Sequence, residues 1–341
     1  MKLISFAVPC YNSQDYMRKC IDSLLTGGDD VEIIIVNDGS RDKTLDIARE
    51  YEREYPGTVK VIDKQNGGHG SGVNAGLQAA TGLYYKVVDS DDWLDENALA
   101  ELIAVIKEHS AKGKLPDLYI TNFVYEHTID NTRYVSSYEK KFPVRVFADW
   151  KRVKRFRLSH MLLMHALTYK REKLLESDTW LPEHTFYVDN LFAYKPLPYM
   201  KSIYYLDVDL YRYFIGRADQ SINRDNFVKR YDQQIRVMRR MIDAYSWDEL
   251  KKLPKGLKRY MWHSLVVIMM NTIFFTCAAD APERRDALRE LWLHIKRRDI
   301  KLYRKLRRRS YTTAVNYMPW KMRAWVMGVG YDILCKKIKL G

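Results

Sequence analysis

The chain has 341 residues, 47% of them hydrophobic, which is enough for a substantial core and for more than one small domain. Its net charge of +14 is uneven, because residues 1–110 hold 11 Lys and Arg against 19 Asp and Glu, whereas residues 111–341 hold 46 against 24. The four cysteines lack the paired spacing of a zinc site, and the N-terminal apolar run is too short for a secretory signal. We therefore expect a cytoplasmic protein with reduced thiols.

The first third of the chain alternates apolar runs that predict strands with amphipathic segments that predict helices. We expect strands at 3–8, 31–36, 59–62, 83–88 and 118–121, and helices around 17–25, 45–51, 74–80 and 96–107. This alternation is typical of an α/β, doubly wound sheet, in which ligands bind at the carboxyl ends of the strands. Polar clusters stand at four such ends, at residues 9–12, 37–40, 66–71 and 89–92. Their convergence predicts a binding site at this edge.

Three aspartates directly follow the fourth expected strand: Asp89, Asp91 and Asp92. Helix capping would explain only one acid, Asp92 or Asp95. A calcium loop of the EF-hand type would need glycine where the chain has Leu94. The pattern therefore favours Mg²⁺ or Mn²⁺ shared between these carboxylates and the phosphates of a ligand.

Two further features stand at the same edge. Asp38 follows the second strand, where an acid commonly contacts a nucleoside, although it could also be only a turn residue. The loop NGGHGSG (66–72) matches neither a dinucleotide fingerprint nor a P-loop. Its His69 is either a ligand contact or only a loop residue.

From about residue 225 the chain is predicted to be helical and basic. The long uncharged stretch 261–279 favours a buried helix over an interfacial helix or a membrane span. The segments 296–309 and 317–340 combine Arg and Lys with aromatic residues, as on a solvated helical face or at an anionic bilayer surface. Nucleic-acid binding is not favoured, because no RNA-binding module is recognisable.

Five segments resemble, in order and spacing, the inverting family 2 glycosyltransferases of GT-A fold: VPCYN (8–12), VNDGS (36–40), NGGHGSGVNAG (66–76), ATGLY (80–84) and DSDDW (89–93). The resemblance implies a mixed, doubly wound GT-A sheet over residues 1–224, with a donor-binding half at 1–110 and an acceptor half at 111–224. A basic helical region, 225–341, would follow it.

The resemblance also implies roles for single residues. The nucleotide of a nucleotide-sugar would contact Pro9, Tyr11, Asn12 and Asp38. The family's D-x-D motif falls on Asp89 and Asp91, which would hold Mn²⁺ or Mg²⁺ against the donor diphosphate. Where many members carry Ala-Arg-Asn this chain has Gly72-Val73-Asn74, so His69 is the candidate to replace the missing Arg as a donor contact.

A general base is implied by the segment LPEHTFYVDNLFAY (181–194), which places Asp189 at the start of a helix, with Val188 in place of the usual Glu. Asp189 could also cap that helix, and the two roles are compatible. His165 could line the acceptor site or pack in the core.

The segment LYRYFIGRADQSI (210–222) is similar to one that closes over the donor diphosphate in related enzymes. Its candidate diphosphate or acceptor contacts are Arg212, Arg217, Gln220 and Ser221. A solvated stretch of strand and loop is the alternative.

These interpretations together predict a metal-dependent inverting glycosyltransferase. It would move a sugar from a nucleotide-diphosphate donor, a UDP-sugar, to a saccharide or lipid-linked saccharide in cell-surface polysaccharide synthesis. The basic helical region would dock it peripherally on the inner face of the plasma membrane. The alternatives are a sugar nucleotidyltransferase and a non-catalytic basic module that binds RNA or another anionic polymer.

Overall fold

The computed structural model describes residues 2–127, 131–216, 229–310 and 313–338. The chain forms two compact units. One comprises Met1–Lys154 and Leu162–Gly216, and the other comprises Arg155–Met161 and Arg217–Gly341. The domain boundary expected after residue 224 falls in 217–228, outside the described residues, so it stays a prediction.

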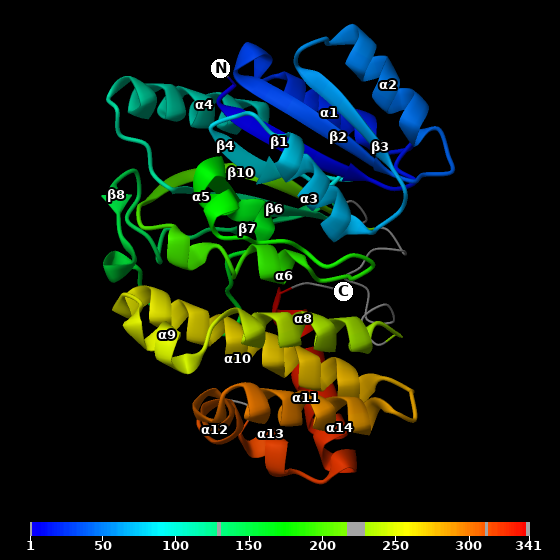
Figure 1. Ribbon diagram of the computed structural model, residues 1–341, viewed down its shortest axis with the longest axis vertical. Coiled ribbons are helices and arrows are strands. Elements are labelled where there is room, and N and C mark those ends of the chain that lie inside the picture. The colour runs from blue at the N-terminus through cyan, green and yellow to red at the C-terminus, as the bar shows by residue number, and fades with distance from the viewer. Residues whose placement is uncertain (1, 128–130, 217–228, 311–312, 339–341) are drawn as a thin grey trace. The chain divides into compact units, whose positions relative to one another are not determined.

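A single mixed sheet is the centre of the first unit (Figure 1). Four parallel strands form one side of it, in the order β3 (Val59–Lys64), β2 (Val31–Asp38), β1 (Ile4–Cys10) and β4 (Tyr84–Val87). The sheet continues through β9 (Leu167–Lys170), β6 (Leu118–His127), β10 (Ile203–Ile215) and β5 (Trp93–Leu94). Strand β7 (Thr132–Ser136) pairs with β6, and β8 (Phe147–Ala148) pairs with β10. Because β9 is antiparallel to both of its neighbours, the sheet is mixed, as expected.

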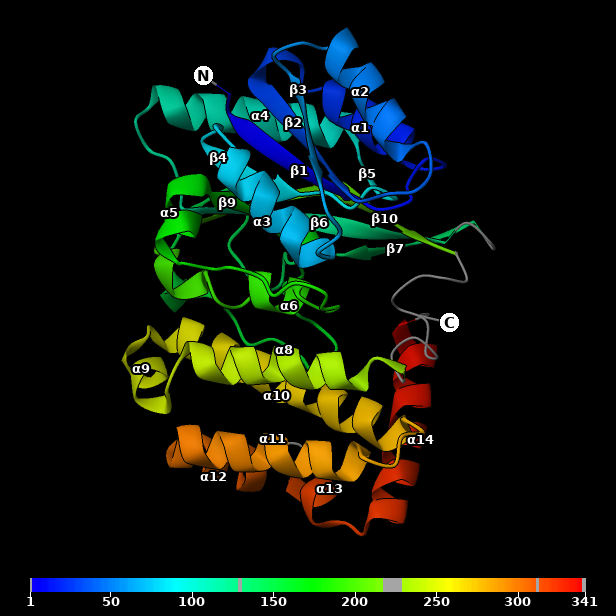
Figure 2. The ribbon, with the colours of Figure 1, turned by 45° about the vertical axis from the view of Figure 1, so that its right-hand side comes forward.

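The helices of this unit cover both faces of the sheet. Figure 2 shows α3 (His69–Ala79) over one face, while α1 (Met17–Leu25) and α2 (Thr44–Glu54) lie over the other. Right-handed crossovers require this division, because the chain reverses its direction across the sheet after β3. Helix α4 (Glu96–Ala111) is capped by Asp95, whose carboxylate accepts a hydrogen bond from the N–H of Ala98 (3.1 Å). The shorter elements are η1 (Gly28–Asp30), η2 (Trp150–Arg152), η3 (Met164–Ala166), α5 (Arg171–Glu176), α6 (Asp189–Phe192) and η4 (Leu197–Tyr199).

Helix α3 begins earlier than its sequence predicts. It starts at His69, within the glycine-rich segment, and not near residue 74. Glycines disfavour a helix in isolation, but here they permit close packing on β1. A Cβ at Gly72 would lie 2.9 Å from the Cβ of Pro9, and one at Gly76 would lie 2.5 Å from that of Ala7. Tertiary packing therefore outweighs local propensity at this helix.

The register of the parallel strands brings the polar clusters together. Cys10 pairs with Asn37 across β1 and β2, and Ala7 pairs with Val87 across β1 and β4. The residues that follow β1, β2 and β4 therefore lie at one edge of the sheet, as expected for this topology.

The second unit is helical, as the sequence indicates for residues after 225. Its helices are α8 (Tyr231–Ala244), α9 (Trp247–Lys252), α10 (Lys255–Ala278), α11 (Arg284–Arg298), α12 (Ile300–Arg308), α13 (Thr313–Tyr317) and α14 (Trp320–Ile338). Among the helices described, α10 alone is long and apolar enough to cross a membrane, and 67% of its apolar window is buried within the structure. A core helix has the same properties, and α10 packs against α8, α9, α11 and α14.

Candidate active site

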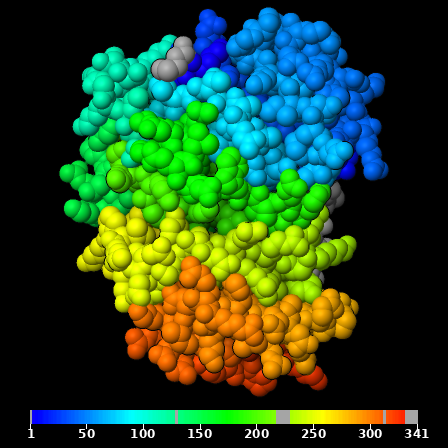
Figure 3. Space-filling model, in the orientation of Figure 1, coloured from blue at the N-terminus to red at the C-terminus, as the bar shows by residue number. Residues whose placement is uncertain are grey.

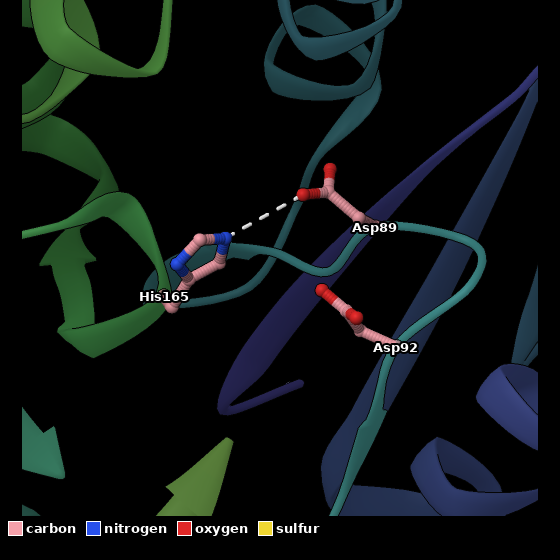
Figure 4. A group of neighbouring side chains, drawn as sticks. All are labelled: Asp89, Asp92 and His165. Carbon is pink, nitrogen blue, oxygen red and sulfur yellow. Dashed lines mark ion pairs between the residues drawn. The ribbon is translucent and has the colours of Figure 1, made fainter. Parts of the chain in front are cut away.

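Asp89, just beyond β4, lies between two histidines (Figure 4 shows His165). Its Oδ1 is 2.8 Å from Nε2 of His69, and its Oδ2 is 3.6 Å from Nε2 of His165. Burial raises the pKa of Asp89, but the two histidines outweigh that effect and hold the pKa well below its usual range. Asp89 is therefore a carboxylate at neutral pH, and its side chain is 24% exposed.

Asp92 differs from Asp89 in the direction of its pKa shift. It is buried, its Oδ2 accepts from the hydroxyl of Tyr211 (2.6 Å), and its Oδ1 accepts from the N–H of Phe214 (2.8 Å). Burial, and then the charges of Asp91 and Asp89, raise the pKa of Asp92 well above its ordinary value. These two hydrogen bonds hold the loop of residues 88–92, called the aspartate loop below, against β10.

Three potential ligand atoms for a metal ion converge here. One from each of Asp89, Asp92 and His165 lies within 4.8 Å of the other two (Figure 4). Carboxylate oxygens and an imidazole nitrogen suit Mn²⁺, and carboxylates suit Mg²⁺, so the residues fit a divalent cation. Asp91 is not in this group, yet its charge raises the pKa values of both His69 and Asp92, which places it nearby. The role of Asp91 as a ligand stays a prediction.

His165 both packs in the core and faces Asp89. Its ring centroid is 4.6 Å from that of Tyr211 and 4.8 Å from that of Tyr213. Its backbone carbonyl accepts from Nζ of the buried Lys86 (2.5 Å). Burial lowers the pKa of Lys86 to about 7. In the sequence Lys86 is the one polar residue of the apolar run 83–88, but nothing in that run indicates that the carbonyl of His165 is its partner.

Asp189 belongs to the same cluster. It is the first residue of α6 and the acid of its first turn, while Val188 holds the N-cap position, and the backbone N–H of Asn190 donates to its carboxylate. Burial raises its pKa, and the charges of His165 and His69 partly oppose that shift. An acid with a raised pKa that faces two histidines is suited to accept a proton.

The segment that leads to Asp189 is bound to α3. Asn74 donates from Nδ2 to the carbonyl of Leu181 (2.9 Å) and accepts from its N–H (3.0 Å). The N–H of His184 donates to the carbonyl of Gly67 (2.6 Å). His184 and Tyr187 have positive φ angles of 46° and 64°, a conformation that surrounding contacts must maintain. In the sequence Asn74 is recognisable only as part of a motif, and no local pattern indicates its bonds to Leu181.

A family model described as glycosyl transferase family 2 matches residues 5–173, which include β1, the aspartate loop and His165. Residues 5–173 belong to glycosyl transferase family 2. It is 33% identical over 141 residues to glycosyltransferase GlyA of Streptococcus pneumoniae serotype 4, covering 40% of this chain and 20% of that protein. It is 29% identical over 250 residues to the putative glycosyltransferase EpsH of Bacillus subtilis, covering 68% and 64%. The chain therefore spans less than two thirds of the length of either relative.

Solved structures show the same fold. Residues 1–349 of S. aureus TarS match with a TM-score of 0.59 and 23% identity over 90% of each chain. The mannosyltransferase PcManGT from Pyrobaculum calidifontis, in complex with GDP-Man and Mn²⁺, matches with a TM-score of 0.52 and 15% identity, covering 98% of this chain and 85% of that one. The GT-A fold expected from the sequence is thereby confirmed.

In this family 2 domain, Asp38 holds the glycine loop. Its Oδ1 accepts from Nζ of Lys64 (2.7 Å) and from the N–H of Gly67 (2.9 Å), and its Oδ2 accepts from the N–H of Gly68 (2.7 Å). With three donors on a carboxylate that is almost fully buried, Asp38 shapes the loop before α3. Its contact with a nucleoside stays a prediction.

The other predicted nucleotide contacts lie at the end of β1. Pro9 is buried under Gly72 of α3, and Asn12 accepts from the N–H of Arg41 (2.9 Å). Tyr11 is 52% exposed, so its ring is free to stack on a flat ligand. These positions are compatible with the predicted nucleotide site.

Arg212 is engaged within the sheet. Its guanidinium pairs with Asp95 (2.7 Å) and with Glu126 (3.0 Å), which fastens β10 to β6 and to the start of α4. Its predicted contact with a diphosphate stays a prediction. Arg217, Gln220 and Ser221 lie outside the described residues.

Proposed function

We propose that this chain is an inverting glycosyltransferase that transfers a sugar from a UDP-sugar to a saccharide or lipid-linked saccharide. The main support for the proposal is that two neighbouring acids have pKa values shifted in opposite directions. The pKa of Asp89 is lowered, and the pKa of Asp189 is raised. Two acids whose environments separate their pKa values are typical of a site that divides charge stabilisation and proton transfer between them.

Asp89 and His165 offer ligand atoms that could hold Mn²⁺ or Mg²⁺, whereas Asp92, the third member of their group, accepts from Tyr211 and Phe214. We propose that Asp91 of the D-x-D motif completes the site. When bound, the cation would neutralise the diphosphate of the donor as the bond to the sugar breaks. His69 fixes Oδ1 of Asp89 and leaves Oδ2 directed at His165, which orients the carboxylate.

Asp189 is the proposed general base. It accepts the proton of the acceptor hydroxyl while that oxygen forms a bond to the anomeric carbon and the bond from this carbon to the diphosphate breaks. Attack from the face opposite the leaving group inverts the anomeric centre. Burial raises the pKa of Asp189, which strengthens it as a base, and the charges of His165 and His69 oppose part of that shift.

The proposed substrates draw support from known proteins. TarS has been solved with UDP-GlcNAc, and the similar region of Bacillus subtilis GgaB, 32% identical over 133 residues, belongs to a minor teichoic acid biosynthesis protein. EpsH and GlyA are named as glycosyltransferases. These names favour a UDP-sugar donor and an acceptor that belongs to a cell-surface polymer or to its lipid-linked precursor.

We further propose that the enzyme works at the cytoplasmic face of the plasma membrane and docks there through its basic helical region, from residue 225 onward. The excess of Lys and Arg after residue 110 favours an anionic surface. Exposed aromatic residues of the same region, Tyr317 (59%) and Trp325 (69%), suit the interface between lipid and water.

A donor screen tests the proposed reaction. The purified chain is incubated with UDP-, GDP- and dTDP-sugars in Mn²⁺, Mg²⁺ or EDTA, and release of nucleoside diphosphate is measured with and without saccharide acceptors. We expect release from a UDP-sugar that needs a divalent cation and is lost in Asp189→Asn. No release from any donor, or equal release by that variant, would contradict the proposal.

A further inference from the structure

The helical unit contains a cavity of about 300 Å³ between α11, α12 and α14. Its walls carry five cationic side chains: Arg285, Arg289, Lys296, Arg307 and Arg323. No Asp or Glu stands among the described residues that line it. The cavity is therefore a concentrated positive site within one unit of the chain.

The cations on α11 occupy one face of that helix. Arg285, Arg289, Trp292 and Lys296 are spaced by four, three and four residues, which places them in a single row. The side chains of α11 reach the surface in Figure 3, where this helix is orange. Like charges four residues apart repel one another, so Arg285 and Arg289 oppose the helix unless an anion lies between them.

The described residues place no carboxylate in an ion pair with these cations, whereas neighbouring basic residues do form such pairs. Arg284 pairs with Asp280 (3.7 Å), and Lys301 pairs with Asp248 (2.5 Å). Burial lowers the pKa of Arg323, and the charge of Arg307 adds to that effect.

Aromatic rings hold the guanidinium groups in place. Arg285 lies over the ring of Trp320, 5.1 Å from its centroid, and Arg307 lies over the ring of Trp292 at the same distance. Arg323 is anchored by a donor bond to the carbonyl of Asn316 (2.9 Å). Cation–π contacts use the flat face of an Arg and leave the N–H groups at its edge available to an oxyanion. Three of the five cations, Arg285, Arg307 and Arg323, are thus held in place before any ligand binds.

We propose that this cavity binds a phosphoryl group carried by a ligand from the aqueous phase. Arginine forks match two oxygens of a phosphoryl group, and five cations around about 300 Å³ exceed the charge needed for one carboxylate.

The spacing along α14 favours water over lipid as the source of this ligand. Trp320 and Arg323 share one face of α14, while the exposed Met322, Trp325 and Val329 fall on the opposite face at 100° per residue. When that apolar row contacts a bilayer, the cavity faces away from it.

Calorimetric titration of the full chain with inorganic phosphate and glycerol 3-phosphate, at constant ionic strength set with chloride, tests the proposal. The pocket variant is Arg285→Gln with Arg289→Gln. The matched control is Arg297→Gln with Arg304→Gln, which removes two exposed charges of the same helices outside the cavity. We expect the control to bind like the wild type, and the pocket variant to bind at least about tenfold more weakly, because charge-assisted hydrogen bonds are lost.

Three results would overturn the proposal. One is equal binding by the pocket variant and the control. Another is binding of the phosphates by wild-type protein in acetate but not in chloride at the same ionic strength, which would show a site for any small anion. The third is binding only to phosphatidylcholine–phosphatidylglycerol vesicles and not to the soluble phosphates, which would identify a lipid as the source. Sugar transfer is assayed separately, so this test can fail while the proposed activity stands, and the reverse.

Discussion

Asn74 and Leu181 exchange two hydrogen bonds, which fasten the segment before Asp189 to the helix that begins with His69. His69 in turn holds Asp89 at 2.8 Å. The half-buried amide of Asn74 thus connects the metal-binding side of the site with the proposed base, although the residues concerned come from distant parts of the chain.

Replacing this amide should lower both stability and turnover. Asn74→Ala leaves both backbone groups of Leu181 without their partner, which costs about 1–3 kcal/mol in the free energy of unfolding. We expect a lower Tm and a reduced kcat, with the KM for the donor little changed, because Asp189 shifts relative to Asp89. Asn97→Ala, on the exposed face of α4, is the control. An unchanged kcat in a destabilised Asn74→Ala protein would show that the amide serves stability alone.

Asp189→Asn should retain donor binding and lose transfer. General-base catalysis contributes on the order of 10² to 10⁴ in rate, so kcat should fall by that range. Donor affinity is measured by titration with UDP, and transfer is measured with a saturating acceptor. Asp46→Asn, an exposed acid on α2, should behave like the wild type. If donor affinity collapses and the rate persists, Asp189 is a structural residue.

Substitutions of Asp91 and Asp92 should affect turnover and stability differently. Asp91→Asn should abolish metal-dependent turnover without changing the Tm, because Asp91 is only half-buried. Asp92→Asn should lower the Tm, because Asp92 accepts from Tyr211 and Phe214, and should retain the response to Mn²⁺. Turnover and melting are measured across a Mn²⁺ titration. Full activity of Asp91→Asn in EDTA would refute its role as a ligand.

The pair of Asp89 and His69 should stabilise the metal-free protein over a limited pH range. The pKa of Asp89 is lowered, so its contribution is present above its unfolded value of about 3.9 and is lost as the pH falls toward the folded pKa. Burial lowers the pKa of His69, but the charge of Asp89 and its hydrogen bond raise it by more, so the net shift is upward. The contribution of His69 to stability is therefore present below its unfolded pKa of about 6.5 and is lost as the pH rises through the folded pKa. The Tm difference between wild type and His69→Gln should therefore be largest between about pH 4 and 6.5. A difference that does not vary with pH would exclude the ion pair as its cause.

Membrane docking should depend on the exposed row of α14. Replacing Met322 and Trp325 by Ser removes apolar side chains that are 48% and 69% exposed, so the fold should persist. We expect less co-sedimentation with anionic vesicles, with the remaining binding abolished by high salt. Tyr134→Ser, in the first unit and 40% exposed, is the control. Equal recovery of wild-type protein with neutral and anionic vesicles would exclude docking through basic residues.

Local patterns predicted most of the sheet. The apolar runs at 31–36 and 59–62 became β2 and β3 nearly at their expected bounds, because buried strands need continuous apolar sequence. The start of α3 was misplaced, because glycines at 70, 72 and 76 resemble a loop until β1 is present to pack against them. The sequence predicts that either Asp92 or Asp95 caps α4. The structure shows that Asp95 is the cap, while Asp92 is buried.

Local patterns are enough to predict the α/β alternation, the order of the polar clusters and the edge of the sheet at which they meet, because strand periodicity and chain direction are local properties. Which side chains share a site depends on contacts between distant segments, which no local pattern contains. His165 and Asp189 come from segments far from the aspartate loop in the chain. The pairing of β9 with β4 and the hydrogen bonds that join Asn74 to Leu181 and His184 to Gly67 help to bring them to Asp89. The fold also separates two aspartates of one loop, because the histidines outweigh burial and lower the pKa of Asp89, whereas burial and the neighbouring carboxylates raise the pKa of Asp92.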